Sequence, residues 1–231
     1  MKTLIAIVVI LTLFSCEQTS KTATDGWETI VIGDYVFDFP PDFKLVEEQG
    51  IDSYVGEIQG DSIRFGFDFG YYLSDFGQTT EEYLKDGFWK QHLPHRFMRE
   101  GTTYDRINTP KVEILNIRTA TIQDSIIGKG CDYVAKCKHV KTKFDFPIYI
   151  PEEIKQVYYA IDTIENQHRK MVWAKDPKKG RTGIYLKDLY TYNKSLNSSL
   201  ALSMSTGSLT KEQQELVLKI FKTGRKKNVP E

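Results

Sequence analysis

Alternating hydrophobic and polar positions dominate the chain from residue 27 onward. The runs WETIVI and YVFDFP, and then SYVGEIQ and SIRFGFDFGYY, have the period of two that is typical of half-buried β-strands. Gly33-Asp34 joins the first two runs and Gly60-Asp61 joins the second two. Such dipeptides favour tight turns because glycine adopts a positive φ without steric cost. The pattern predicts two antiparallel hairpins.

The stretch 64–72 places aromatic side chains on one face of its strand and small or charged residues on the other. The aromatic side chains, which we expect in the core, are Phe65, Phe67, Phe69 and Tyr71. Gly66 and Gly70 clear space on the opposite face, where a helix, a neighbouring strand or a ligand must approach closely. We expect structural packing there, and Asp68, between the two glycines, is our candidate for a ligand-binding or functional residue.

Later segments predict helices and further strands. Hydroxyl and acidic residues over Thr79–Leu84 favour a helix start. A capping box at Thr210 and Gln213, followed by an apolar stripe and then Gly224, predicts a C-terminal helix. The expected strands are VEILNIR (112–118), TIQDSIIG (121–128), CDYVAKCKHV (131–140), a segment from Tyr158 that follows a short helical turn after Pro151, MVWAK (171–175), GIYLKDLY (183–190) and SLALSMS (199–205). We expect 121–128 and 131–140 to be joined through Gly128-Lys129-Gly130, and DPKKGRTG (176–183) to be a loop.

These elements predict an α+β fold, an antiparallel β-sheet with one or two packed helices, including the C-terminal helix. The paired strands and closing proline of 27–40, followed by the late SLALSMS strand and the terminal helix, resemble the PsbP-like α/β/α sandwich of several exported proteins and lipoproteins. This resemblance implies a fold and carries no function with it.

The N-terminus has a different character. Lys2 is followed by eleven uncharged residues, Leu4 to Phe14, which are too few for a membrane-spanning helix and fit the apolar centre of a secretory signal peptide. Leu13-Phe14-Ser15-Cys16 resembles the lipobox of bacterial lipoproteins, although Phe14 is bulkier than the usual residue there. The resemblance implies that Cys16 is lipidated and becomes the new N-terminus. The alternative is a plain secreted protein cut near Ser15, with Cys16 left as a thiol.

Composition completes the expected organisation. The chain has 231 residues, 40% of them hydrophobic, which suits one globular domain. We expect a signal peptide at 1–15, the lipidated cysteine and a polar tether at 16–26, a single soluble α+β domain at 27–224 and a basic tail at 225–231. Lys plus Arg and Asp plus Glu number 31 each, so no net field attracts nucleic acid, and we expect no such partner.

Few residues suggest chemistry. Cys131 and Cys137 fall about 20 Å apart on one strand, too far for a disulfide, so we expect two buried thiols. A nucleophilic pair of Cys137 with His139 is the sharper alternative. Asp52 with Asp68 would be a possible acid and base.

We expect no metal and no cofactor. His92 and His95 have a helical ligand spacing, but Pro94 stands between them. The aromatic and basic mixture around Trp89 and Arg96 is superficially like a nucleic-acid surface, and a solvated loop with buried aromatic rings explains it better.

The sequence therefore predicts a lipoprotein attached to a bacterial membrane through Cys16, in the cell envelope. Its soluble domain would be a non-catalytic binding or accessory domain whose partner is another envelope protein or a small ligand. The competing hypothesis is an envelope hydrolase with an unrecognised site, motivated by Asp68, Cys137 and His139. A third is a structural subunit of an envelope complex.

Overall fold

The computed structural model describes residues 25–48, 50–73, 75–93, 111–164 and 166–227. The expected signal peptide, Cys16, most of the tether and the end of the basic tail lie outside these residues. Within the described part, no helix is long and apolar enough to cross a membrane.

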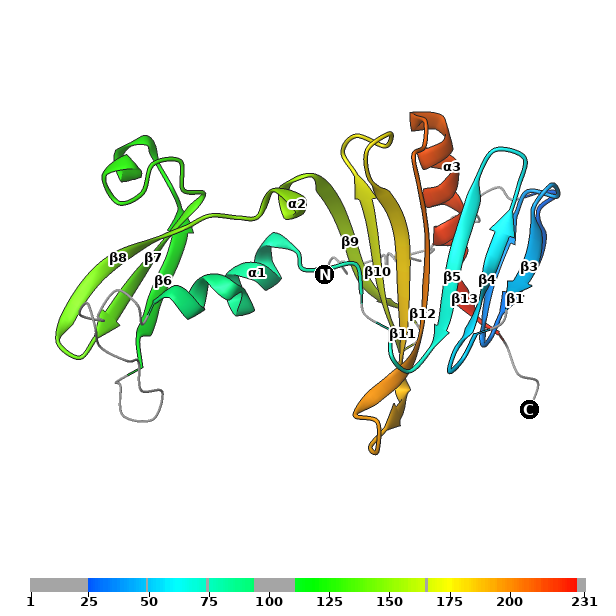
Figure 1. Cartoon of the computed structure of the whole chain (residues 1–231), viewed down its shortest axis with the longest axis horizontal. Coiled ribbons are helices and arrows are strands. Elements are labelled where there is room, and N and C mark those ends of the chain that lie inside the picture. The colour runs from blue at the N-terminus through cyan, green and yellow to red at the C-terminus, as the bar shows by residue number, and fades with distance from the viewer. Residues whose placement is uncertain (1–24, 49, 74, 94–110, 165, 228–231) are drawn as a thin grey trace, which may run out of the picture.

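The predicted α+β class is confirmed (Figure 1): antiparallel strands dominate, and a C-terminal helix is present. The strands are β1 (Glu28–Ile32), β2 (Tyr35–Phe39), β3 (Lys44–Glu48), β4 (Tyr54–Gln59), β5 (Arg64–Gly70), β6 (Glu113–Thr119), β7 (Tyr133–His139), β8 (Thr142–Ile148), β9 (Val157–Ile164), β10 (Gln167–Ala174), β11 (Arg181–Asn193), β12 (Ser198–Gly207) and β13 (Arg225–Lys226). The helices are α1 (Thr80–Asp86), α2 (Glu152–Lys155) and α3 (Lys211–Lys222), with the 3₁₀ helices η1 (Phe88–His92) and η3 (Ile122–Ile126).

The largest sheet, here the main sheet, has the order β3-β4-β5-β12-β11-β10-β9, and β1-β2-β13 form a smaller sheet beside it. Both predicted Gly-Asp hairpins are confirmed, since β1 pairs with β2 and β4 pairs with β5. Gly33 has a φ of 57°, the conformation for which glycine was expected in the first turn.

One face of the main sheet, the inner face, carries the principal core. Phe65 of β5 is fully buried, and its ring contacts Phe39 of β2 and Phe221 of α3 at centroid distances of 5.6 and 5.8 Å. Burying a side chain of this size contributes about 1.5–3 kcal/mol. Helix α3 begins at the predicted capping box, and its apolar stripe packs against this face through Val217, among others. The inner face is therefore closed.

A second buried cluster lies apart from the first. It joins α1 and η1 to the β6-β7-β8 sheet, and Trp89 is its largest side chain. The Trp89 indole Nε1 donates a hydrogen bond to the Tyr83 carbonyl oxygen at 3.0 Å. Figure 1 shows the β6-β7-β8 sheet separated from the main sheet, with α1 and α2 between the two sheets. Buried apolar side chains of the described residues thus gather in two places within the expected 27–224 domain.

The strand predicted at 121–128 is wrong, because this segment contains the 3₁₀ helix η3. Asp124 accepts a hydrogen bond from the Thr121 backbone N–H at 2.7 Å, and Arg118 binds both of its carboxylate oxygens at 2.6 and 2.7 Å. The Arg118 guanidinium, helped by these hydrogen bonds, holds the pKa of Asp124 far below its usual range. Local side-chain bonding of this kind competes with a strand ladder. Strand β7 pairs instead with β6 and with β8, which the sequence analysis did not predict.

The basic residues after α3 have specific partners. Arg225 and Lys226 form β13 against β2, so these two residues of the expected basic tail are strand residues. Arg225 binds the Asp38 carboxylate at 3.0 Å, and Lys226 binds the buried Asp188 carboxylate at 2.5 Å. Their charges are thus used inside the fold.

Candidate ligand-binding groove

The outer face of the main sheet, opposite the core, is divided into a covered half and an open half. Over β10 and β11, the segment after β5 packs directly on the sheet. Gly183 of β11 makes room for Phe76, since a Cβ atom at Gly183 would lie 2.5 Å from the Phe76 ring. Only a residue without a side chain fits beneath this ring.

Lys170 of β10 fastens the same segment. Its side chain is fully buried, and its Nζ donates to Asp75 Oδ2 at 2.9 Å, to Glu82 Oε2 at 3.1 Å and to the Gly77 carbonyl oxygen. Burial raises the pKa of Glu82, but hydrogen bonds from the Thr79 backbone and from Lys170 outweigh burial and lower it overall. Asp75, which the sequence left without a function, thus helps to close this half.

The other half, over β4, β5 and β12, is open. We expected packing opposite both glycines of β5. At Gly70 this is confirmed, because a Cβ atom there would lie 2.9 Å from the Ser53 Cβ. At Gly66 it is wrong: a Cβ atom there would meet no atom within 4 Å among the residues that the structure describes. The space that Gly66 leaves is therefore available to a molecule outside the fold.

Asp68 lies at one end of this opening. In the sheet register it stands between Val55 of β4 and Ser203 of β12. Its Oδ1 atom is buried and accepts no hydrogen bond from any described residue. A buried carboxylate oxygen without a donor is costly, and such atoms are usually satisfied by a bound group or water. The structure therefore places the sequence-predicted Asp68 in a position suited to contact a ligand.

Two adjoining shallow and open hollows of about 330 and 560 Å³ share Gly66 and Ser205 and form one shallow groove along β5 and β12. We call it the outer-face groove. Its residues are Glu48, Val55, Gly56, Glu57, Gly66, Phe67, Asp68, Lys178, Lys179, Gly180, Arg181, Ser203, Ser205, Thr206, Gly207 and Ser208.

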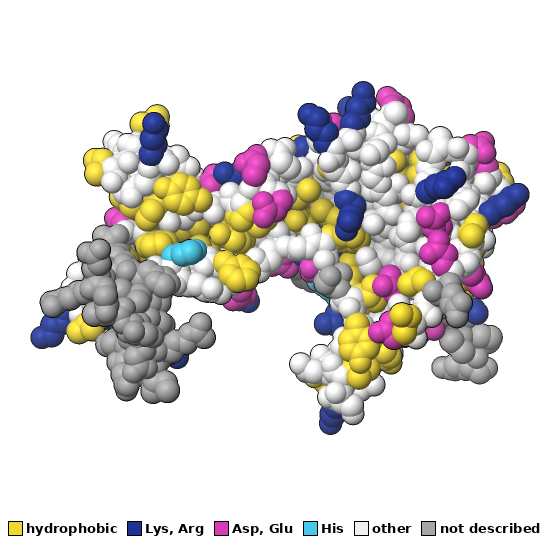
Figure 2. Space-filling model, viewed as in Figure 1, with side chains coloured by type: hydrophobic (Ala, Val, Ile, Leu, Met, Phe, Trp, Pro, Cys, Tyr) yellow, Lys and Arg dark blue, Asp and Glu magenta, His cyan; other side chains and the backbone are white. Residues whose placement is uncertain are grey.

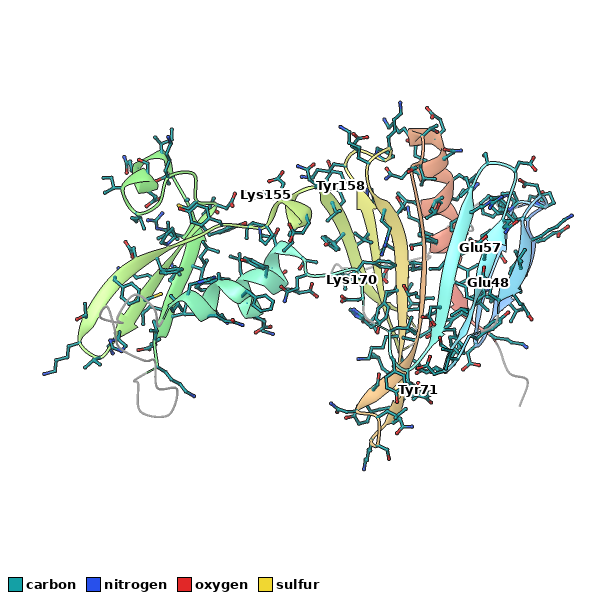
Figure 3. The ribbon with its side chains drawn as sticks, in the orientation of Figure 1. Glu48, Glu57, Tyr71, Lys155, Tyr158 and Lys170 are labelled. Carbon is teal, nitrogen blue, oxygen red and sulfur yellow. The ribbon has the colours of Figure 1, made fainter. Side chains whose placement is uncertain are left out.

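The groove has opposite charges at its two ends. The smaller hollow is lined by three carboxylates, those of Glu48, Glu57 and Asp68, without a basic residue. The larger hollow is lined by three cations, those of Lys178, Lys179 and Arg181, without an acidic one. Figure 3 shows Glu48 and Glu57 close to each other over the strands β3 to β5, and Figure 2 shows basic side chains gathered at the β10–β11 end of the main sheet.

Most of these charges are not neutralised by neighbours. The Lys179 ammonium lies 3.4 Å from the Asp176 carboxylate, and both are largely exposed, which makes their attraction weak. Glu57 accepts a hydrogen bond from the Gln59 amide at 2.7 Å, which leaves its charge in place. No described carboxylate forms an ion pair with Lys178 or Arg181. The groove can therefore attract a positive group at one end and a negative group at the other.

The other candidate residues lie elsewhere. Cys137 and His139 are on β7 in the second cluster, and the Cys137 side chain is fully buried, so a substrate could not reach its sulfur without displacing the packing. Cys131 precedes β7 and is only half-buried, which corrects the expectation for that thiol; the two cysteines do not form a disulfide. Asp52 is exposed in the β3–β4 loop.

His92 ends η1, whereas His95 and the basic residues that follow it lie outside the described residues. Within the described part, no group of three or more His, Cys, Asp or Glu side chains is arranged to hold a metal ion.

A further hollow of about 320 Å³ lies between α1, α2 and β9. Its lining is mainly apolar and includes Phe76, Tyr83, Ile154 and Tyr159. Unlike the outer-face groove, its described lining presents no pair of opposite charges, and Glu153 is the only carboxylate among those lining residues. The outer-face groove has the more specific chemistry and is our candidate site.

A scan against protein-family models finds no family that matches this chain, and a search of curated proteins finds no matching relative. The site must therefore be interpreted from its geometry.

Apart from Asp68, sequence reasoning missed the charged residues of the groove. Two signals were present. Glu57 and Gly66 face each other across the β4–β5 hairpin, and Ser203 and Ser205 put small hydroxyl groups at alternate positions of a strand. Neither signal could be connected to the Lys178–Arg181 loop before the strand order was known.

Proposed function

We propose that this chain is a lipid-anchored protein of a bacterial cell envelope, held at the membrane through Cys16, and that its folded part binds a small ligand in the outer-face groove without catalysing a reaction. The observation that carries the binding half of the proposal is the opening above Gly66, with an unpartnered Asp68 oxygen at its edge. In ligand sites a small number of precisely placed polar or charged groups fix the orientation of the ligand.

The N-terminal sequence supports the anchor. Residues 4–14 form a short apolar run, and Leu13-Phe14-Ser15 precedes the cysteine. Each buried acyl CH₂ group contributes about 0.8 kcal/mol, so several chains on Cys16 would hold the protein stably. The ten largely polar residues 17–26 would then span roughly 16–19 Å and keep the folded part clear of the lipid headgroups.

Detergent phase partition tests the anchor. Wild-type protein expressed with its own N-terminus in a bacterial host should enter the detergent phase, and its N-terminal peptide should carry acyl chains by mass spectrometry. Cys16→Ser should move the protein to the aqueous phase, whereas Cys131→Ser should not. An unmodified N-terminal peptide from the wild type would overturn the anchor.

Thermal shifts test the binding. The full-length protein in detergent micelles is melted with a panel of small amino acids, peptides, polyamines, sugars and phosphate esters. Gly66→Trp places a large ring in the groove from a position where the added Cβ atom meets no described atom within 4 Å, and Thr163→Trp adds the same ring to an exposed position of β9 outside the groove. A stabilising compound should lose its effect in Gly66→Trp and keep it in Thr163→Trp. A panel without any such compound would contradict binding in the groove.

A further inference from the structure

We infer that the outer-face groove takes a short zwitterionic peptide of about four residues in an extended conformation, with its free amino group at the Asp68 end and its free carboxylate at the Arg181 end. This inference rests on the proposed function and names the ligand class of that site. It follows from the spacing of the charges, the polar floor and the opposite charges at the two ends of the groove.

The spacing is set by the sheet register. Asp68 pairs with Ser203, and Arg181 pairs with Gly207, four residues further along β12. Four residues of a strand extend about 13 Å, and β5 and β11 lie on opposite sides of β12, about 10 Å apart, so the Cα atoms of Asp68 and Arg181 are about 16 Å apart. An extended peptide gains at most about 3.3–3.6 Å per residue, so a chain of about four to five residues spans this distance. A single amino acid would be too short to reach both charged ends.

The floor suits a peptide backbone. Ser203 and Ser205 are half-buried, and they present hydroxyl groups on the same face two residues apart. The backbone groups of an extended peptide repeat with this same period of two. Each hydroxyl can donate or accept a hydrogen bond, and the gap at Gly66 lets a backbone approach the sheet closely.

The charges of the groove determine which end of the peptide lies at which end of the groove. Asp68 lines the smaller hollow with a half-buried carboxylate, and an ammonium group supplies up to three hydrogen-bond donors to such a group. Arg181 presents a planar guanidinium that can bind a carboxylate with two parallel hydrogen bonds. The Arg181 guanidinium carbon lies over the Phe76 ring, 5.9 Å from the ring centroid. This contact helps to orient the guanidinium without neutralising its charge.

Isothermal titration calorimetry with tetra-alanine on the full-length protein in detergent micelles tests the inference. The same titration is made with its N-acetylated and its C-amidated forms, and with di-alanine and octa-alanine. We expect tetra-alanine to bind, each blocked form to bind about tenfold more weakly, and di-alanine to bind more weakly than tetra-alanine.

Two variants assign the ends of the peptide. Asp68→Asn should weaken tetra-alanine about tenfold and leave the affinity of the N-acetylated form unchanged. Arg181→Gln should likewise weaken tetra-alanine about tenfold and leave the affinity of the C-amidated form unchanged. Asp61→Asn, in the exposed β4–β5 turn, and Lys143→Gln, on β8, are charge-matched controls and should change nothing. A purely structural role for Asp68 or Arg181 would lower the affinity of free and blocked peptides equally.

The outcomes separate the two proposals. Equal affinity for free and blocked peptides, or no binding of tetra-alanine, overturns the peptide inference. If another compound of the panel still loses its thermal shift in Gly66→Trp, the groove binds a different ligand and the proposed function stands. If no compound does, both proposals fail.

Discussion

Replacing Lys170 with Met tests how the covered half of the outer face is held. The substitution keeps the length of an unbranched side chain and removes the ammonium group that binds Asp75, Glu82 and the Gly77 carbonyl oxygen. The fully buried position suits Met. The substitution should therefore remove the polar contacts of Lys170 and keep most of its packing.

The size of the effect follows from the exposure of the partners. Removing one member of a buried ion pair costs about 3–5 kcal/mol when the remaining charge stays buried. The Asp75 and Glu82 side chains are 38% and 42% exposed, so water can hydrate them once the ammonium is gone. The Gly77 carbonyl also loses a donor. We therefore expect the free energy of unfolding to fall by about 2–3 kcal/mol at neutral pH.

The loss should depend on pH with a definite sign. Because the native pKa of Glu82 is lowered, its stabilising contribution is complete above the unfolded pKa, near 4.3, and is lost as pH falls through the native value. Without Lys170 the native pKa rises towards its ordinary value, since only the Thr79 hydrogen bonds remain. The difference between wild type and variant should therefore be largest near neutral pH and smaller below about pH 4.

Urea unfolding followed by circular dichroism at about pH 7 and about pH 3.5 measures both effects. Lys44→Met, at an exposed position of β3 in the same sheet, is the control and should change stability little. The reasoning would be refuted if Lys170→Met were as stable as this control, or if its deficit were the same at both pH values.

Three other contacts give simple tests. Gly183→Ala should destabilise the fold by about 1–3 kcal/mol because its Cβ would meet the Phe76 ring, and the loss should largely disappear in a Phe76→Ala background; equal losses in both would contradict the contact. In folded protein, iodoacetamide followed by peptide mass spectrometry should label the half-buried Cys131 well before Cys137, and simultaneous labelling would show that β7 opens readily. Tyr35→Phe should cost less than about 0.5 kcal/mol, since the buried hydroxyl, whose pKa burial raises, has no hydrogen-bond partner among the described residues; a loss above about 1.5 kcal/mol would contradict this.

The hairpins and the C-terminal helix could be predicted because their determinants are local. Gly33 permits the turn of the first hairpin, and the capping box at Thr210 and Gln213 begins α3 where expected. In 121–128, apolar residues also suggested a strand, but Asp124 and Arg118 stabilise a 3₁₀ helix there. That ion pair joins the end of β6 to η3, and the pattern of hydrophobic and polar residues does not determine how these two segments lie relative to each other.

The candidate site was predictable only in part. Asp68 was identified from its place between two glycines, yet the same reasoning treated Gly66 and Gly70 alike. They differ because the Ser53 side chain lies over Gly70 and no described residue lies over Gly66. Whether a glycine makes room for the fold or for a ligand depends on the neighbouring segment, and a single strand sequence does not reveal it.

By itself, the sequence determined the antiparallel strands, the capped terminal helix and the aromatic face that forms the core, because these follow from side-chain period and local backbone preference. Only the tertiary structure decided which half of the outer face stays open. It also brought Glu57 of β4 and Arg181 of β11 to opposite ends of one groove. Strand order depends on packing between residues far apart in the chain, and that order makes a bipolar groove from charges that the sequence leaves unconnected.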